Sequence, residues 1–452
     1  MSKFDYAYDS EGEITNWTQQ QTFTSSVYNF QYDAAGQLVE ALQSGAASST
    51  NEYAYDAAGN RLSERTNTVV EGASYNNVNE LTNRSSGGPL RFRGSVNEPI
   101  SNATVAGNAA IVDSGTNFTG YASVNPGSNT VQVAVSDYNG NTVAHYYSVV
   151  LSNGTSQTLT YDLNGNLVNV TNTTTGASTS YAWDAANRLV DIYINGTHQT
   201  EFLYDGLGRR VFQGETDNNG DNTISWMLWS GTELCEERDE DGTVVKRYFP
   251  QGQWQGGTTY FTRDHLGSIR EMMDNISDID AEYTYDPWGR QTKVGGFMDA
   301  DFGFTGHYYH APSGLHLALY RAYNADLGRW LGRDPIEETG GFNLYGYVEN
   351  EPLAQIDPDG TVIVWIEAVL VVAGFTILVI TIIHRINASK GNSGNGLTDA
   401  LATMPTVVKE VPKGVAQVAY PPTLSGSETV GDLVRGQIQN QIIGKVVDKA
   451  CP

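Results

Sequence analysis

Polar and apolar positions alternate over short stretches of this chain, and pairs of aromatic residues two positions apart recur along it. A typical unit reads Tyr53-Ala54-Tyr55-Asp56 and is followed by Gly59 and Leu62. Residues two apart lie on the same face of a β-strand, so the aromatic pair predicts one buried strand face. An Asp followed three residues later by Gly predicts a tight turn, because the carboxylate can accept a backbone N–H two residues on.

The unit is repeated, which makes a repeat architecture the main prediction. Within the blocks the Asp residues lie 21 to 24 positions apart. Each unit is expected to form an antiparallel hairpin that cannot bury its aromatic face alone, so neighbouring hairpins should stack into one long, curling sheet. The predicted fold is therefore all-β, an antiparallel β-shell. The units begin at Tyr6, Phe30, Tyr53, Leu159, Tyr181, Phe202 and Tyr283, and a degenerate copy without the Asp spans Tyr75 to Leu81.

Residues 90–150 interrupt the repeat. Val131, Val133 and Val135 alternate with other residues, and the turn sequence Asp137-Tyr138-Asn139-Gly140-Asn141 leads into a second run of β-forming residues. This pattern predicts a hairpin and, together with the stretch before it, a small inserted β-sandwich. The insert resembles the small immunoglobulin-like inserts of bacterial surface proteins, and its role as a spacer or as an adhesion module stays open.

Composition and charge narrow the classes of protein. The net charge is −25, and residues 361–452 hold seven Lys/Arg against six Asp/Glu, so the acidity belongs to residues 1–360. An acidic shell repels phosphates, and we expect no nucleic-acid binding by it. Two cysteines, Cys235 and Cys451, are too few for a disulfide framework or a cysteine zinc cluster. The first residues contain no apolar signal-peptide core and start inside a repeat unit, which fits a piece of a longer gene product.

Three motifs carry a resemblance to a known family. The repeats resemble the YD repeats of Rhs proteins, toxin-complex C subunits and teneurins. The string YFTRDHLGSI at Tyr260–Ile269 resembles a motif that lies just before the Rhs repeat-associated core, and residues 302–360 resemble that core itself. The resemblance implies a cocoon of β-strands, incomplete for a chain with so few repeats. It also implies a core that cuts off a variable C-terminal segment by an aspartic-protease-like reaction.

Carried over residue by residue, the family's catalytic positions fall on Arg321, Asp334 and Asp357. Two carboxylates held close together cannot both ionise, so one keeps a proton. The ionised one can then activate water, while the protonated one polarises the carbonyl that is cut. The resemblance places the cut between Thr361 and Val362. The family usually has Leu where this chain has Thr361, so recognition of the bond differs here.

Two further clusters contain residue types that can bind a metal ion. His307, His310 and His316 precede the core, but their spacing lacks a further ligand, and we interpret them as surface or packing histidines. The sequence from Asp217 to Asp221 is similar to the start of a calcium loop, but Leu228 stands where that loop needs a carboxylate, so a hairpin turn is expected. The sequence thus indicates no metal and no cofactor.

The stretch Val362–Ile383 is strongly apolar. It contains 22 residues with one charge, Glu367. As a helix it would be about 33 Å long and would match a hydrocarbon core of ~30 Å. We therefore expect a transmembrane helix at 362–384, with the alternative that this β-branched stretch is a buried segment of a soluble domain.

Two functions are compatible with these features. In the first, the chain is the C-terminal part of a secreted or cell-surface Rhs-type protein that releases residues 362–452, a membrane-acting effector, with an immunity protein or a secretion machinery as partner. In the second, it is a non-enzymatic, membrane-anchored envelope protein that contacts carbohydrate or a cell surface. The expected domains are repeats at 1–89 and 151–301, the insert at 90–150, the core at 302–361, the helix at 362–384 and a variable tail at 385–452.

Overall fold

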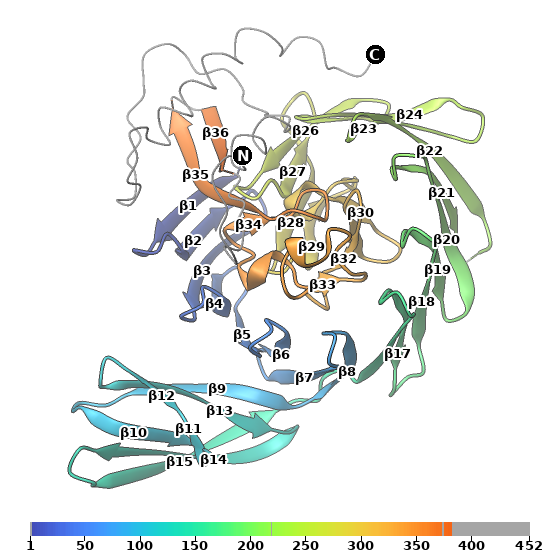
Figure 1. Ribbon diagram of the computed structural model, residues 1–452. Helices are drawn as coiled ribbons and strands as arrows, with labels where there is room; N and C mark the ends of the chain where they lie inside the picture. Colours follow the sequence, from blue (N-terminus) through green and yellow to red (C-terminus); the bar gives the residue numbers. More distant parts are fainter. Residues whose placement is uncertain (1, 218, 373–374, 382–452) are drawn as a thin grey trace, which may run out of the picture. The chain divides into compact units, whose positions relative to one another are not determined.

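A computed structural model describes residues 2–217, 219–372 and 375–381 of the chain (Figure 1). Its contacts divide the chain into two units, Met1–Ile363 and Val364–Pro452. The predicted variable tail, 385–452, lies outside the described residues. The first unit contains the repeats, the insert and the core, and the candidate site is built from it.

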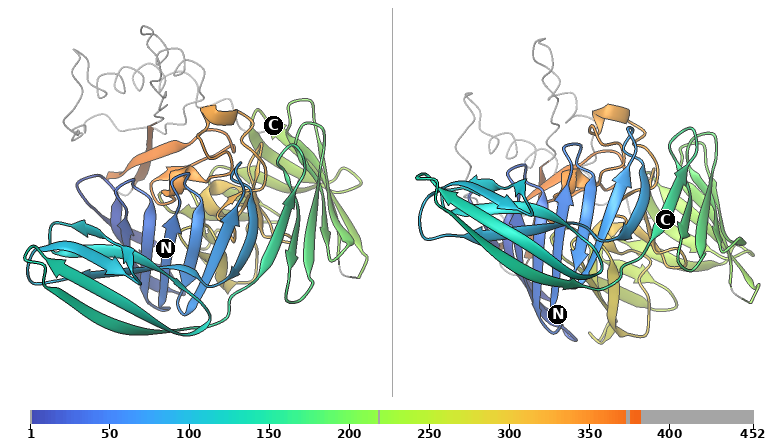
Figure 2. Two further views of the ribbon diagram at one scale, coloured as in Figure 1. Left: turned by 60° about the horizontal axis from the view of Figure 1, so that its bottom comes forward. Right: turned by 90° about the horizontal axis from the view of Figure 1, so that it is seen from below.

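The repeats of the first unit form one antiparallel sheet of 22 strands, as the all-β prediction required. Each strand pairs with the next along the chain, and β8 pairs directly with β16 across the insert. Figure 2 shows the successive strands side by side. Among the described residues, β1 pairs only with β2 and β29 only with β28, so no backbone ladder closes the sheet.

The strands before the insert are β1 (Lys3–Tyr8), β2 (Ile14–Gln20), β3 (Ser25–Tyr32), β4 (Leu38–Gly45), β5 (Ser49–Tyr55), β6 (Arg61–Thr66), β7 (Val69–Tyr75) and β8 (Leu81–Ser86). Those after it are β16 (Gln157–Tyr161), β17 (Leu167–Asn172), β18 (Ser178–Trp183), β19 (Leu189–Ile194), β20 (Thr197–Tyr204), β21 (Arg210–Thr216), β22 (Asn222–Ser230), β23 (Glu233–Arg238), β24 (Val244–Phe249), β25 (Gly252–Trp254), β26 (Thr258–Arg263), β27 (Ile269–Met273), β28 (Ile279–Tyr285) and β29 (Gln291–Gly296).

The repeat turns have the chemistry that their sequence predicts. The carboxylate of Asp56 accepts the backbone N–H groups of Ala58 and Asn60 at 2.9 and 2.8 Å, and Gly59 has φ of 74°. Such a positive φ favours glycine. Asp217 accepts from Asn219 and Asp221 in the same way, so the sequence that is similar to a calcium loop forms a hairpin turn between β21 and β22.

The second aromatic residue of a repeat also has a polar role. The hydroxyl of Tyr55 donates to the carbonyl of Leu38 at 2.7 Å, and Tyr204 donates to Leu189 at the same distance. Trp183 uses its indole N–H to donate to Leu167 at 2.8 Å. In each case the acceptor is the first residue of the return strand in the preceding hairpin. Each repeat is therefore fastened to its neighbour by a side-chain hydrogen bond as well as by the strand ladder.

The insert consists of two small sheets. One contains β11-β10-β14-β15 and the other β12-β13-β9. Their shared core is apolar and includes Leu90, Ile100, Phe118 and Val131. The bounds are β9 (Gly88–Ser95), β10 (Ile100–Val105), β11 (Asn108–Ala109), β12 (Ile111–Asp113), β13 (Asn117–Val124), β14 (Gly127–Asp137) and β15 (Thr142–Leu151).

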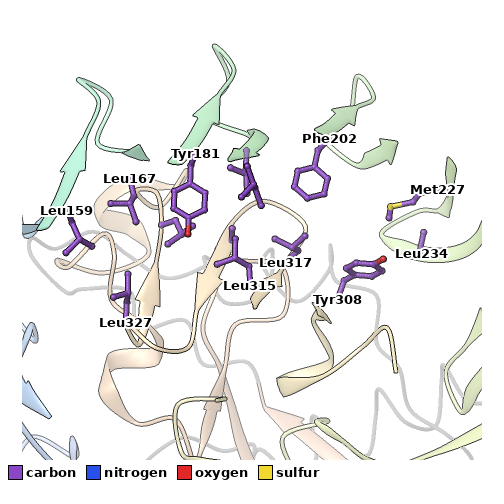
Figure 3. Close-up of a cluster of buried hydrophobic side chains, with 14 of the residues drawn as sticks. Leu159, Leu167, Tyr181, Phe202, Met227, Leu234, Tyr308, Leu315, Leu317 and Leu327 are labelled. Carbon is purple, nitrogen blue, oxygen red and sulfur yellow. The ribbon is translucent and has the colours of Figure 1, made fainter. Parts of the chain in front are cut away.

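The segment after the repeats folds into short strands and turns that pack against the sheet. Buried residues of the repeats, including Leu167, Tyr181 and Phe202, share one apolar cluster with Leu315 and Leu317 of this segment (Figure 3). Its elements are η1 (Phe304–Gly306), β30 (Tyr308–His310), β31 (Leu315–Leu317), β32 (Ala322–Asn324), β33 (Arg329–Trp330), η2 (Glu337–Thr339), η3 (Val348–Asn350) and β34 (Gln355–Ile356). We call residues 302–361 the core segment.

Polar side chains of the core segment bind carbonyls in the repeat turns. Tyr345 donates to Gly165 at 2.8 Å, and Asn350 donates to Gly59 at 2.9 Å. Tyr323 donates to Trp288 at 2.8 Å. These acceptors lie in three different hairpin turns on the same edge of the sheet. The turns therefore form the surface to which the core segment is bound.

The prediction of a helix at 362–384 was wrong for the described part of that stretch. Residues Val364–Val372 form β35 and residues Phe375–Thr381 form β36, and the two strands pair antiparallel. Most side chains in the stretch are β-branched, and such residues favour strands over helices because χ1 is restricted in a helix. Within the described part of the chain, no helix has the length and apolar character needed to span a bilayer.

Candidate active site

The three residues predicted to be catalytic come from separate turns of the core segment and meet at one point. Arg321 directly precedes β32, Asp334 follows β33, and Asp357 follows β34. One guanidinium nitrogen, Nη2 of Arg321, lies 2.8 Å from Oδ2 of Asp334 and 2.8 Å from Oδ2 of Asp357. The two carboxylate oxygens are therefore at most twice that distance apart, which is close enough for the acids to interact directly.

The same residues hold the backbone at the end of the core segment. The other oxygen of Asp357, Oδ1, accepts the N–H of Gly360 at 3.0 Å and the N–H of Thr361 at 2.8 Å. Arg321 Nε donates to the carbonyl oxygen of Gly360. The Gly360–Thr361 peptide group is thus bound on both sides, its carbonyl by Arg321 and its N–H by Asp357.

Burial shapes the protonation of the acids. The side chains of Arg321, Asp334 and Asp357 are all buried. Burial raises the pKa of Asp357 to about 6, against the opposing effect of the Arg321 charge, and burial also raises the pKa of Asp334. Desolvation lowers the pKa of Arg321, partly offset by the two carboxylates. An arginine remains charged under these conditions, so the charge of Arg321 opposes the protonation that burial of the two carboxyl groups favours.

A cation–π contact with a buried tryptophan holds the arginine in place. The guanidinium carbon of Arg321 lies 4.3 Å from the ring centre of Trp330, within the range of a cation–π interaction. Trp330 is itself buried between Tyr323 and Tyr347, with ring centres 5.5 and 5.7 Å away. The aromatic interior of the core segment therefore limits the positions that the guanidinium can adopt.

The two residues of the predicted cleavage site differ in their contacts. The hydroxyl of Thr361 donates to Oδ1 of Asp359 at 2.7 Å, and the Thr361 N–H also reaches that oxygen at 3.1 Å. The polar side chain that replaces the usual leucine thus has a polar partner. Val362 follows directly and is half-buried. Asp359 was not singled out from the sequence, although its place two residues after Asp357 made a local turn contact foreseeable.

The three histidines in the first part of the core segment bind separate partners. Their Nε2 atoms contact the carbonyl of Asp357 (His307, 2.9 Å), the carboxylate of Glu215 (His310, 2.7 Å) and the carbonyl of Gly289 (His316, 3.0 Å). All three are buried, which corrects the surface alternative and agrees with packing. Burial lowers the pKa of His307 to about 4 and that of His316 to about 3. The contact of His307 with Asp357 was missed, because a separation of 50 positions gives no spacing signal.

Comparisons with known proteins agree with the predicted family. Residues 2–87 match the family model described as Teneurin YD-shell, and residues 161–198 match the model described as RHS Repeat. These matches show that the chain contains repeats of the Rhs and YD-shell type, in agreement with the repeat turns of the structure.

Several toxins are similar to this chain. The toxin protein Tse5 of Pseudomonas aeruginosa is 24% identical, over 79% of this chain and 27% of its own length. The double-stranded DNA deaminase toxin A of Burkholderia cenocepacia is 26% identical, over 40% of this chain and 15% of its own. The tRNA nuclease WapA of Bacillus subtilis is 25% identical, over 52% of this chain and 10% of its own length. The chain thus spans only a small part of each of these relatives.

Among solved structures, the crystal structure of TcdB2-TccC3-TEV is similar over 79% of this chain and 20% of that chain. The sequence identity is 16% and the TM-score is 0.35.

Proposed function

We propose that this chain is the shell-and-core part of a larger secreted or cell-surface toxin of the Rhs type. In this proposal the core segment cuts its own chain between Thr361 and Val362 and frees residues 362–452 as an effector segment. The observation that carries the proposal is the placement of two buried carboxylates on one nitrogen of Arg321, beside the backbone of residues 360 and 361. The similarity to toxins supports it.

The proposed chemistry is hydrolysis by an acid pair. The ionised carboxylate removes a proton from water, and the water oxygen bonds to the carbonyl carbon of Thr361. The protonated carboxyl stabilises the developing oxyanion and then supplies a proton to the departing amine of Val362 as the C–N bond breaks. Arg321 holds both acids and the preceding peptide group, so the bond to be cut is presented at a high effective concentration.

The effector segment needs partners outside this chain. A toxin that is released in the producing cell requires an immunity protein, and a secreted one requires export machinery, so we propose both as partners. The acidic shell is not a nucleic-acid surface in this proposal. The nuclease and deaminase activities in the names of the relatives belong to those proteins.

Intact-mass measurement of the purified 452-residue chain tests the proposal. We expect two fragments in place of the 49.1 kDa chain. Asp334→Asn and Asp357→Asn should leave the chain whole, and Arg321→Ala should slow the cut at least tenfold. Glu338→Gln is the matched control, because Glu338 is an exposed acid four residues from Asp334. A chain that stays whole for days, in the wild type and in Thr361→Leu alike, would refute self-cleavage.

A non-enzymatic surface protein is the second candidate. The salivary gland surface protein 1 of Aedes aegypti, which is 36% identical over 22% of this chain and 3% of its own length, favours this alternative. An intact chain combined with carbohydrate or cell binding by the repeats would support it.

A further inference from the structure

The D-H-L-G-S sequence at Asp264–Ser268 forms the turn between β26 and β27 and has so far no place in the proposed chemistry. The turn has the repeat geometry, since the Asp264 carboxylate accepts the N–H groups of Leu266 and Ser268, both at 3.0 Å. Its His265 is buried and points away from that local network. The imidazole instead contacts two segments that are distant in sequence.

His265 joins the first strand of the sheet to the core segment. Its Nε2 lies 2.8 Å from the carbonyl oxygen of Leu353, and its Nδ1 lies 2.9 Å from the hydroxyl of Tyr6 in β1. A carbonyl only accepts, so Nε2 carries the proton and Nδ1 accepts from Tyr6. Burial lowers the pKa of His265, which favours this neutral form. The Tyr6 ring packs edge-on against the imidazole at 4.6 Å.

His265 lies where the two ends of the sheet meet. Strands β1 and β29 share no ladder, but carboxylate side chains of β27 and β28 accept backbone N–H groups from the start of the chain. Ser2 donates its N–H to Glu271 at 3.0 Å, and Phe23 donates its N–H to Glu282 at 3.0 Å. The Tyr6–His265 contact belongs to this junction. It therefore forms only when the first strands lie against the last ones.

A second histidine, His307, contacts the C-terminal end of the segment 353–357, whose first residue contacts His265. His307 Nε2 is 2.9 Å from the carbonyl oxygen of Asp357, and its Nδ1 is 3.2 Å from the hydroxyl of Thr305. Thr305 donates its N–H to Ser268 of the same turn at 3.0 Å. Residues 353–357 are thus held at both ends by imidazoles, and both contacts lead back to the turn Asp264–Ser268.

We propose that His265 and His307 are positioning residues, and that contact between the two ends of the sheet sets the orientation of the Asp357 carboxylate through them. The inference deepens the proposed function by naming what regulates the site. The acid pair is completed only when the first and last repeats have come together. A chain whose first and last repeats are not in contact would keep its effector segment attached.

Hydrogen exchange tests this inference without relying on cleavage. The N–H groups of Gly360 and Thr361 both donate to Asp357 Oδ1, so their exchange rates report the orientation of that carboxylate. The parent is the full chain with Asp334→Asn, which keeps Asp357 and blocks the proposed cut. Tyr6→Phe then removes one hydroxyl and leaves the ring. Loss of one hydrogen bond should raise exchange at residues 360 and 361 about three- to tenfold.

Three controls make the result specific. Tyr8→Phe alters an exposed tyrosine of the same strand and should change nothing. His265→Leu should raise the exchange further, whereas His265→Gln, which retains a donor and an acceptor, should restore most of the protection. The amides of β31 serve as an internal reference. If His265→Leu fails to fold, the exchange rates of Tyr6→Phe and His265→Gln still test the positioning role of His265.

In the cleavable full chain, Tyr6→Phe should slow the cut by the same factor. Exchange within twofold of the parent in Tyr6→Phe would overturn the inference, and so would an equal rise in β31, which indicates global loosening. A wild-type chain that is never cut would refute the proposed function alone, and the exchange rates would then decide the positioning role by themselves.

Discussion

At the scale of single residues, the acid pair combines two opposing influences. Burial favours the neutral carboxyl groups, while the charge of Arg321 favours their ionised forms. For Asp357 the effect of burial is the larger one, so its pKa is raised to about 6. The sequence predicted which three residues meet, on the strength of the family resemblance. It could not predict that Arg321 would also bind the Gly360 carbonyl, because that contact depends on how three separate turns pack.

The proposed cut should depend on pH in a defined direction. The reaction needs one protonated and one ionised carboxyl, and Asp357 loses its proton as the pH rises through about 6. The rate constant should therefore fall by about tenfold per pH unit above that value, and fall again in acid where both acids are protonated. Intact-mass time courses between pH 4 and 8 measure it. A rate that is level from pH 6 to 8 would contradict the assignment of Asp357.

A second prediction concerns the hydroxyl that fastens one repeat to the next. Tyr55→Phe leaves the Leu38 carbonyl without this donor and should lower the free energy of unfolding by about 1 kcal/mol. Urea titration of the full chain measures the change. Tyr138→Phe is the control, since that side chain is 76% exposed. Equal stability of the two variants would show that the aromatic ring alone matters in the repeat.

At the scale of elements, the sequence predicted the hairpins better than the apolar C-terminal stretch. The aromatic pairs, the Asp and the Gly each act locally, so strand, turn and return strand follow from residues close in sequence. Val362–Ile383 is different, because a continuous apolar run does not distinguish a buried strand from a helix. Its length favoured a membrane helix, whereas its β-branched residues agree with the strands β35 and β36.

Glycine substitutions in the turns separate local strain from docking of the core segment. Gly289 has φ of 90°, and a Cβ there would collide with the Phe304 ring. Gly242 has φ of 80° in a turn with nothing within 4 Å. Gly242→Ala should cost about 1–2 kcal/mol from backbone strain alone. Gly289→Ala should cost a further ~1–3 kcal/mol from overpacking. Equal losses of stability in the two variants, measured by thermal unfolding, would indicate that the core segment can shift at this turn without an added cost in free energy.

At the scale of the whole molecule, the repeats and the core segment depend on one another. The core segment has short strands, and its polar side chains donate hydrogen bonds to backbone carbonyls of several repeat turns. Those partners lie up to about three hundred positions away in the chain, as for Asn350 and Gly59. No periodicity in the sequence encodes such pairs. The fold was therefore predictable from local patterns, while the contacts that position the core segment on the repeats were not.

The most direct test of the account is the mass of the smaller fragment released by the purified full chain. A fragment that corresponds to residues 362–452 is the predicted result and would assign the cut to the Thr361–Val362 bond. A fragment that begins at Thr361 would instead assign it to the peptide group bound by Arg321 and Asp357. A single species at 49.1 kDa that persists through incubation at pH 6 would contradict self-cleavage.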